Sequence, residues 1–386
     1  MTPQTFTLHA SDADLADLHE RLARTRYPDR APGEAWAWGT DPDWLRELVA
    51  YWRERFDWRA QEARLNAWPN FRVRMAAFDG LPLHFLHVSG KGPRPLPLLL
   101  AHGWPGSVFE FLELIPLLTD PAAHGGDAAD AFTVVAPSLP GYGLSFEPGQ
   151  RRFSVEEMAE VLVALMVDVL GFERFGTQGG DWGAFVTSRL ALVHPGRVVG
   201  LHLNLLPLRR DPKLAAESVA EAAYVEQLRR WLKDETGYQA IQGTRPQTLA
   251  AALTDSPAGL AAWIGEKFRA WSDCDGVVER AIDRDTMLAN ISLYWFSGAI
   301  GSSFWPYYAR MHGPWPIPDG RTVDVPAGYA EFPREILRPP RVLAERMFSD
   351  IRRWSVMPRG GHFAALEQPA ALAEEIRAFF APLRGR

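Results

Sequence analysis

Through the first 70 residues, apolar side chains recur at the intervals of amphipathic helices. Leu15, Leu18 and Leu22 follow Ser11, whose side chain suits the N-cap position of a helix. The stretch "PDWLRELVAYWRERFDW" (42–58) repeats the helical spacing. We therefore expect residues 1–70 to form an N-terminal helical extension.

The hydrophobic period changes after residue 70, where short apolar runs alternate with helical patterns. Two helical patterns, 107–120 and 154–172, open with the S-x-x-E sequence of a capping box, at Ser107–Glu110 and Ser154–Glu157. Strands that alternate with helices indicate a mostly parallel sheet covered by helices. The predicted strands include "FRVRMAAF", "LPLHFLHVSG", "LPLLLAHGW", "FTVVAPSLPG", "RFGTQ" and "VVGLHLNLL".

This alternation stops after Pro207. Residues 208–315 carry helical patterns almost throughout, as in "AGLAAWIGEKFRAW" and "DTMLANISLYWFSGAI". Strand and helix patterns return over residues 316–386 with "VPAGYAEFP", "RMFSDIRRWSVMP" and "QPAALAEEIRAFFAPL". The sequence thus predicts an α/β core in two parts, residues 71–207 and 316–386, interrupted by a helical cap at 208–315.

Composition narrows the choice of partners. The 386 residues carry a formal net charge of −6, so no basic field favours nucleic acid. One cysteine excludes an internal disulfide framework and fits a reducing compartment. The opening residues lack the features of a signal peptide, and the longest apolar run is too short to span a bilayer. We expect a soluble cytoplasmic protein with no membrane anchor, and a homo-oligomer remains open.

The clearest candidate for chemistry is "GGDWG", residues 179–183, which lies between a predicted strand and a predicted helix. Many hydrolases place a nucleophilic serine at the middle of such a turn, where small flanking residues permit a tight backbone. Here the middle residue is Asp181. An aspartate at the start of a helix also commonly caps it. The turn alone favours neither interpretation.

A nucleophile of this kind is followed along the chain by an acid and then by a histidine. His362 lies in "RGGHFAALEQP", a glycine-rich loop between a predicted strand and the last predicted helix. The candidate acids in the returning core segment are Glu331, Glu335, Asp319 and Asp324. Each of these is also typical of a solvated surface charge.

A second glycine-rich loop, "HGWPGS" (102–107), follows a predicted strand. Backbone N–H groups of such a loop could stabilise a developing oxyanion, although ordinary strand-to-helix turns look similar. No H-E-x-x-H or C-x-x-C pattern is present. We therefore expect neither a metal nor a cofactor.

Five motifs in order, "HGWPGS", "SLPGYGLS", "QGGDWG", "FPREIL" and "GGHFAALEQP", resemble those of the α/β-hydrolase-fold epoxide hydrolases of the microsomal and juvenile-hormone type. The likeness continues into the helical segment with "ETGYQAIQGTRPQTLAAALTDSPAGLAAWIGEKF" and "YWFSGAIGSSFWPYYAR". It covers most of the chain. One departure is that membrane-bound relatives carry an apolar N-terminal anchor, whereas this chain starts without one.

The resemblance implies a role for each matching residue. Asp181 would be the nucleophile, Glu335 the acid and His362 the base. Tyr238 and Tyr307 would donate to the ring oxygen, although Tyr308 is adjacent and a one-residue gap would exchange the two. The expected oxyanion-hole donors are the backbone N–H groups of Trp104 and Trp182.

The implied partners are a small apolar epoxide and water. A haloalkane-type dehalogenase that uses the same aspartate is the nearest alternative, and a non-catalytic ligand-binding member of the fold is another. Tryptophans in or beside the helical segment favour a bulky apolar or aryl epoxide, and some of them could merely pack that segment; they are Trp263, Trp271, Trp295, Trp305 and Trp315.

Overall fold

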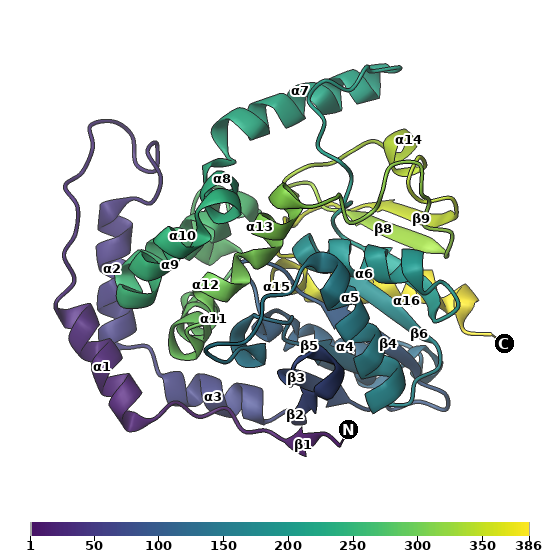
Figure 1. Ribbon diagram of the computed structural model, residues 1–386, viewed down its shortest axis with the longest axis horizontal. Helices are drawn as coiled ribbons and strands as arrows, with labels where there is room; N and C mark the ends of the chain where they lie inside the picture. Colours follow the sequence, from purple (N-terminus) through teal and green to yellow (C-terminus); the bar gives the residue numbers. More distant parts are fainter. Residues whose placement is uncertain (1, 386) are drawn as a thin grey trace.

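A computed structural model describes residues 2–385 and contains a nine-stranded sheet in the order β1-β2-β3-β5-β4-β6-β7-β8-β9 (Figure 1). The strands are β1 (Gln4–Thr5), β2 (Asn70–Met75), β3 (Leu81–Val88), β4 (Leu96–Ala101), β5 (Phe132–Pro137), β6 (Phe175–Gly179), β7 (Val198–Leu203), β8 (Ala327–Glu331) and β9 (Ile351–Val356). The two-residue β1 was not predicted, because so short a strand leaves no periodic pattern.

The sheet is antiparallel from β1 to β5 and parallel from β5 to β9, so the prediction of a mostly parallel sheet is confirmed. Central strand β4 reads as a continuous apolar run because both of its faces are covered. Its Leu98, Leu99 and Leu100 are fully buried. The carboxyl ends of the parallel strands share one edge, where loops can bring distant residues together.

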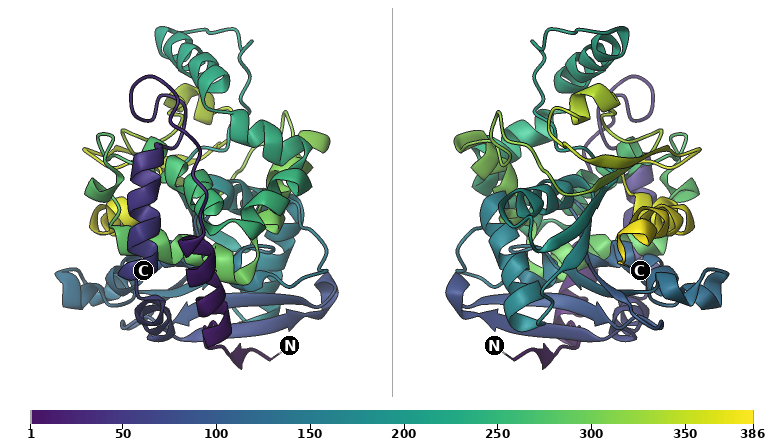
Figure 2. Two further views of the ribbon diagram at one scale, coloured as in Figure 1. Left: turned by 90° about the vertical axis from the view of Figure 1, so that its left-hand side faces the viewer. Right: turned by 90° about the vertical axis from the view of Figure 1, so that its right-hand side faces the viewer.

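Helices cover both faces of the sheet, with α4 and α16 on one side and α5 and α6 on the other (Figure 2). Helix α16 lies close to the sheet because glycines face it: a methyl group at Gly176, Gly200 or Gly328 would meet the rings of Phe379 or Phe380. The helices of the core are α4 (Leu114–Thr119), α5 (Val155–Ala164), α6 (Asp181–Val193), α14 (Arg341–Ala344), α15 (Ala364–Glu367) and α16 (Pro369–Phe380).

One of the two predicted capping boxes forms. The Ser154 hydroxyl and the Glu157 side chain exchange bonds with each other's backbone at the start of α5, which continues as a π-helical turn over Leu165–Val169. The continuous helix predicted at 107–120 is wrong. A 3₁₀ turn, Val108–Phe111, precedes the short α4, and the Ser107 hydroxyl accepts from the N–H of Phe109. The side chain of Glu110 turns inward instead.

An all-helical segment joins β7 to β8 and lies over the carboxyl edge of the sheet (Figure 1). Its helices are α7 (Val219–Asp234), α8 (Gly237–Thr244), α9 (Pro246–Asp255), α10 (Pro257–Trp271), α11 (Arg284–Ser297), α12 (Ile300–Ser303) and α13 (Trp305–His312). Helix α8 packs against α13. This segment therefore roofs the loops that carry the candidate residues.

The N-terminal segment wraps the helical segment and also reaches the sheet through β1. Its helices are α1 (Asp12–Ala23), α2 (Pro42–Glu54) and α3 (Trp58–Asn66), and Ser11 and Asp14 form a capping box at the start of α1. The Tyr51 hydroxyl donates to Asp285 at 2.8 Å, which ties α2 to α11. None of the helices in residues 2–385 combines the length and apolar character needed to cross a bilayer.

Candidate active site

Asp181 occupies a strained turn between β6 and α6. Its φ is +45°, in the left-handed region that non-glycine residues seldom occupy. The turn closes because its neighbours are glycines: a methyl group at Gly183 would overlap the Ala101 carbonyl, and one at Gly103 would overlap Asp181 itself. Such strain persists only where the surrounding structure enforces it, and it marks functional sites. The carboxylate is thereby held above the carboxyl edge of the sheet.

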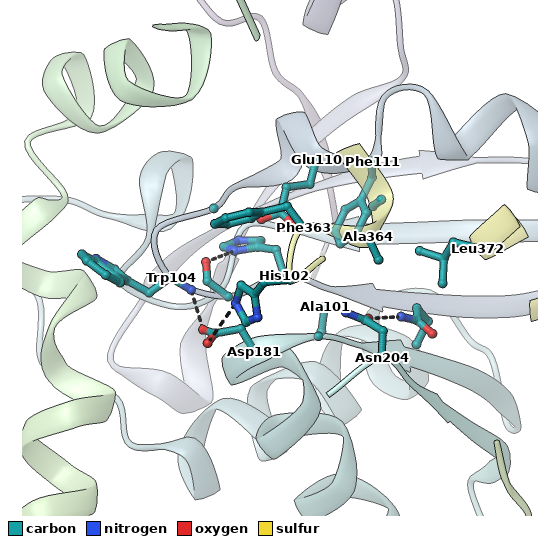
Figure 3. A pocket seen from close by; sticks show the side chains of 16 residues that line it. Ala101, His102, Trp104, Glu110, Phe111, Asp181, Asn204, Phe363, Ala364 and Leu372 are labelled. Carbon is teal, nitrogen blue, oxygen red and sulfur yellow. Dashed lines mark hydrogen bonds and ion pairs between the residues drawn. The ribbon is translucent and has the colours of Figure 1, made fainter. Parts of the chain in front are cut away.

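A backbone donor and a histidine hold the two oxygens of Asp181 differently (Figure 3). The N–H of Trp104 donates to Oδ1 at 2.8 Å. Oδ2 lies 3.5 Å from Nε2 of His362. Oδ1 therefore has a fixed donor, and Oδ2 is the oxygen that faces the histidine.

His362 is joined to Glu335 on its other side. Its Nδ1 lies 2.7 Å from Oε1 of Glu335, and both side chains are buried. Glu335 Oε1 also accepts from the N–H of Ile336 at 2.7 Å. The loops after β8 and β9 carry these residues, and an isolated bridge between Arg334 and Gly361 keeps the loops adjacent. A single line of carboxylate, imidazole and carboxylate results.

The other acids considered in the sequence lie elsewhere. Asp319 forms a surface pair with Arg209 at 3.3 Å, and Asp324 accepts from the Ser349 hydroxyl at 2.6 Å. The sequence pattern could not choose among the acids, because it does not specify which loop folds back toward His362. Of these candidate acids in residues 2–385, Glu335 lies within hydrogen-bond distance of His362.

Two carboxylates control the charge of His362. Burial alone would lower the pKa of the imidazole, but Glu335 and Asp181 outweigh it and raise the pKa to about 10. The resting histidine is therefore an imidazolium at neutral pH. Loss of either carboxylate charge would lower its pKa and favour release of the proton.

Aromatic rings of the helical segment close over Asp181. The Tyr238 ring stacks on Trp104 with centroids 5.5 Å apart, and Tyr307 meets the same indole edge-on at 5.8 Å. Tyr307 also meets Trp182 at 4.8 Å. Tyr308 instead stacks on Trp305 at 4.8 Å, away from this cluster. Of the two adjacent tyrosines, Tyr307 is therefore the one that contacts the neighbours of Asp181, and its role as a donor stays a prediction.

A small cavity of about 20 Å³ touches Asp181, His362 and Glu110. Figure 3 shows Asp181 and Glu110 among the side chains that line it. A polar cavity of this size holds about one water molecule. Glu110 was missed in the sequence because its spacing from Ser107 suggested a helix cap. Its carboxyl lies where a side chain at Gly106 would extend, and burial raises its pKa to about 8.

The "HGWPGS" loop is held from above by α11. Asn290 donates to the Pro105 carbonyl at 2.7 Å, and the Tyr294 hydroxyl donates to the Gly106 carbonyl at 2.8 Å. These bonds fix the backbone that presents the Trp104 N–H. Tyr294 opens the quoted stretch "YWFSGAIGSSFWPYYAR", but neither bond could be predicted from the sequence, because the bonds join segments more than 180 positions apart.

Comparison with known proteins identifies the family. A model described as "Epoxide hydrolase N terminus" matches residues 3–111, and one described as "alpha/beta hydrolase fold" matches residues 97–240. A protein of Stigmatella aurantiaca with a provisional epoxide hydrolase name is 45% identical over 99% of this chain and 85% of its own length. Epoxide hydrolase 1 of Oryctolagus cuniculus is 39% identical over 97% of this chain and 88% of its own.

This chain belongs to the α/β-hydrolase-fold epoxide hydrolases. The solved structure of the Aspergillus niger epoxide hydrolase agrees with it at a TM-score of 0.87 and 30% identity, covering 99% of this chain and 97% of that one. The juvenile hormone epoxide hydrolase of Bombyx mori has the same TM-score and identity, with 99% and 95% covered. Membership in the family and the α/β-hydrolase fold, both inferred from the motifs, are confirmed.

Proposed function

We propose that this epoxide hydrolase converts a bulky apolar or aryl epoxide into a vicinal diol through an ester on Asp181. The observation that carries the proposal is the line from Asp181 through His362 to Glu335 beneath two buried phenols. A carboxylate is ionised at neutral pH and can displace the oxygen from a strained ring carbon. A serine would form an ether, which offers water no carbonyl to attack.

In the first step, Oδ2 of Asp181 forms a bond to an epoxide carbon as the ring C–O bond breaks. The ring oxygen takes a proton from Tyr238 or Tyr307, whose phenols act as general acids. Asp181 becomes a neutral ester, so one of the two charges that raise the pKa of His362 disappears. His362 then releases its proton and the phenolate takes one up, so that the phenol is restored and the imidazole is neutral before the second step.

In the second step, neutral His362 takes a proton from water in the small cavity, and the hydroxide adds to the Asp181 carbonyl. The Trp104 N–H already bonds to Oδ1 and would stabilise the negative charge that develops there, a contribution of typically about 3 kcal/mol. The N–H of Trp182 is the second proposed donor. Collapse releases the diol alkoxide, which takes the proton of the new carboxylic acid and restores the resting site.

Tryptophans at the site support an apolar substrate. The ring centroid of Trp271 lies 5.3 Å from that of Tyr238 and 5.1 Å from that of His362, so Trp271 borders the reacting groups. Trp305 and Trp315 line a separate cavity of about 550 Å³ beside α13, and because none of Asp181, His362 and Glu335 borders it, these two tryptophans do not bear on the substrate. Trp263 bonds to Gln242 and Trp295 lies under Arg21, which are packing roles.

Paired assays test this proposal against the dehalogenase alternative. The protein is incubated with styrene oxide and, separately, with a haloalkane, and diol and halide are measured. We expect diol without halide, because a leaving halide needs N–H donors and gains nothing from two phenols. Asp181→Asn should abolish diol formation while the protein stays folded. Halide release without diol would overturn the proposal, and no turnover of either substrate would favour a ligand-binding role.

A further inference from the structure

A buried hydrogen-bonded chain ends on one of the two phenols. Gln239 follows Tyr238 in α8, and its Nε2 donates to the Tyr238 oxygen at 2.8 Å. Arg310, on the facing helix α13, donates from Nη2 to Oε1 of Gln239 at 3.1 Å. Tyr238 and Gln239 are buried, at 5% and 7% exposure. The chain therefore joins two helices through groups that water hardly reaches.

The chemistry of the donors fixes the direction of every bond in this chain. A guanidinium has only donors, so the atom of Gln239 that faces Arg310 must be the amide oxygen. The amide nitrogen must then face Tyr238, whose oxygen accepts. The phenol hydrogen is not used in this bond and remains free. If the amide were reversed, its oxygen would accept from the phenol and occupy that hydrogen.

Arg310 is itself held in place. Its guanidinium lies 5.5 Å from the ring centroid of Trp182 and 5.7 Å from that of Trp315. Within residues 2–385, the side chain of Arg310 donates to the Gln239 amide oxygen and not to a carboxylate. A charged group that is mostly buried without a carboxylate is costly to maintain. Burial and the neighbouring Arg210 lower its pKa to about 10, so it remains charged at neutral pH.

We infer that Gln239 and Arg310 are positioning residues that keep Tyr238 a hydrogen-bond donor toward the substrate oxygen. Gln239 occupies the acceptor side of the phenol, and Arg310 prevents the amide from reversing. The inference rests on the proposed role of Tyr238 in ring opening. Burial and the nearby Asp181 raise the pKa of Tyr238, and Arg210, Gln239 and Arg310 oppose part of that rise.

Substitutions at Gln239 test the inference in single turnovers with enzyme in excess over styrene oxide. The reaction is quenched with acid at intervals, and the intact mass of the protein is measured to follow ester formation and ester loss separately. Gln239→Met removes the donor at nearly constant length. Gln239→Glu keeps an acceptor for Arg310 but presents only acceptors to the phenol. Both should slow alkylation about tenfold, which is less than the 10²–10⁴-fold that general acid catalysis typically contributes, because the phenol itself is still present. Ester hydrolysis should change less than about twofold, because it uses no phenol.

Three comparisons make the test specific. Gln242→Met changes another buried glutamine of α8, whose Oε1 accepts from Trp263, and should leave the ratio of the two rates unchanged. Arg310→Lys, which retains a donor, should lose less alkylation rate than Arg310→Met. In a Tyr238→Phe background, neither substitution at Gln239 should slow alkylation further, because the group being positioned is gone.

Parent-like alkylation by Gln239→Glu would overturn the inference, and so would equal slowing by that substitution in the Tyr238→Phe background. If Gln239→Met does not fold, Gln239→Glu decides the question, since its ion pair with Arg310 supports folding. If Tyr238→Phe alone alkylates at the parent rate while diol still forms, the donor role of Tyr238 fails and the inference fails with it. If Tyr238→Phe is slow and Gln239→Glu is not, the proposed function stands and only the positioning role fails.

Discussion

Replacing Glu110 by glutamine should make the protein more stable at alkaline pH. In the native state burial raises the pKa of Glu110 to about 8 from its ordinary 4.5, so the carboxyl keeps its proton between those values, whereas the unfolded chain loses it. The stability that this proton supports is complete below pH 4.5 and is lost as the pH rises to 8. Glutamine resembles the protonated acid and cannot ionise.

The size of the effect follows from that window. Each pH unit between 4.5 and 8 costs the parent about 1.4 kcal/mol relative to Glu110→Gln, up to about 5 kcal/mol in total. This value is a ceiling, because the Glu110 side chain is only half-buried as a whole. Above pH 8 the difference between parent and variant should stop growing.

Urea unfolding followed by tryptophan fluorescence, at intervals from pH 5 to 8.5, measures the difference in unfolding free energy. Glu34→Gln, at an exposed position, is the control and should give a flat difference. A difference that grows with pH for Glu110→Gln alone supports the account. A flat difference for Glu110→Gln would mean that the native carboxyl is solvated or already ionised. That result would contradict the buried position of Glu110 in the small cavity beside Asp181.

Three further results are expected. His362→Gln should slow ester hydrolysis far more than alkylation, so that the alkylated protein accumulates and is visible in the intact mass; normal turnover would remove His362 from the mechanism. Tyr238→Phe with Tyr307→Phe should alkylate more slowly than either single change, by up to about 10²–10⁴-fold overall, and parent-rate ring opening by the folded double variant would refute the donor assignment. Gly103→Ala should place a methyl against the Asp181 carboxylate and nearly abolish alkylation, and an active variant would show that the turn is less tight than described.

Local patterns predicted most of the fold. The capping residues of α1 and α5, the apolar run of β4 and the glycines around Asp181 each dictate their local structure, so the sequence sufficed there. In place of the helix expected at 107–120 there are a 3₁₀ turn and a short helix, and the Glu110 side chain expected to cap a helix lines a cavity that only the folded chain creates. Local pattern therefore succeeded where the neighbours along the chain decide the structure.

Long-range partners were beyond prediction from pattern. The bond between Arg310 and Gln239 joins residues 71 positions apart, and although both lie in stretches that carry the family resemblance, nothing in those stretches indicates that the two side chains meet. The choice of Glu335 over three other acids came from the family resemblance, and Tyr307 could not be separated from Tyr308 by spacing. Which of these residues meet is decided by contacts between separate helices and loops. The hydrophobic periodicity of a single sequence reports local structure and does not reveal such contacts.

The oxygen source of the diol tests the central claim most directly. A single turnover is run in ¹⁸O-labelled water with enzyme in excess over styrene oxide, and the diol and the peptide containing Asp181 are analysed by mass. Attack by Asp181 predicts an unlabelled diol and one ¹⁸O in the aspartate, because water attacks the ester carbonyl. A labelled diol with an unlabelled aspartate would mean direct attack by water on the epoxide, and would contradict the ester mechanism.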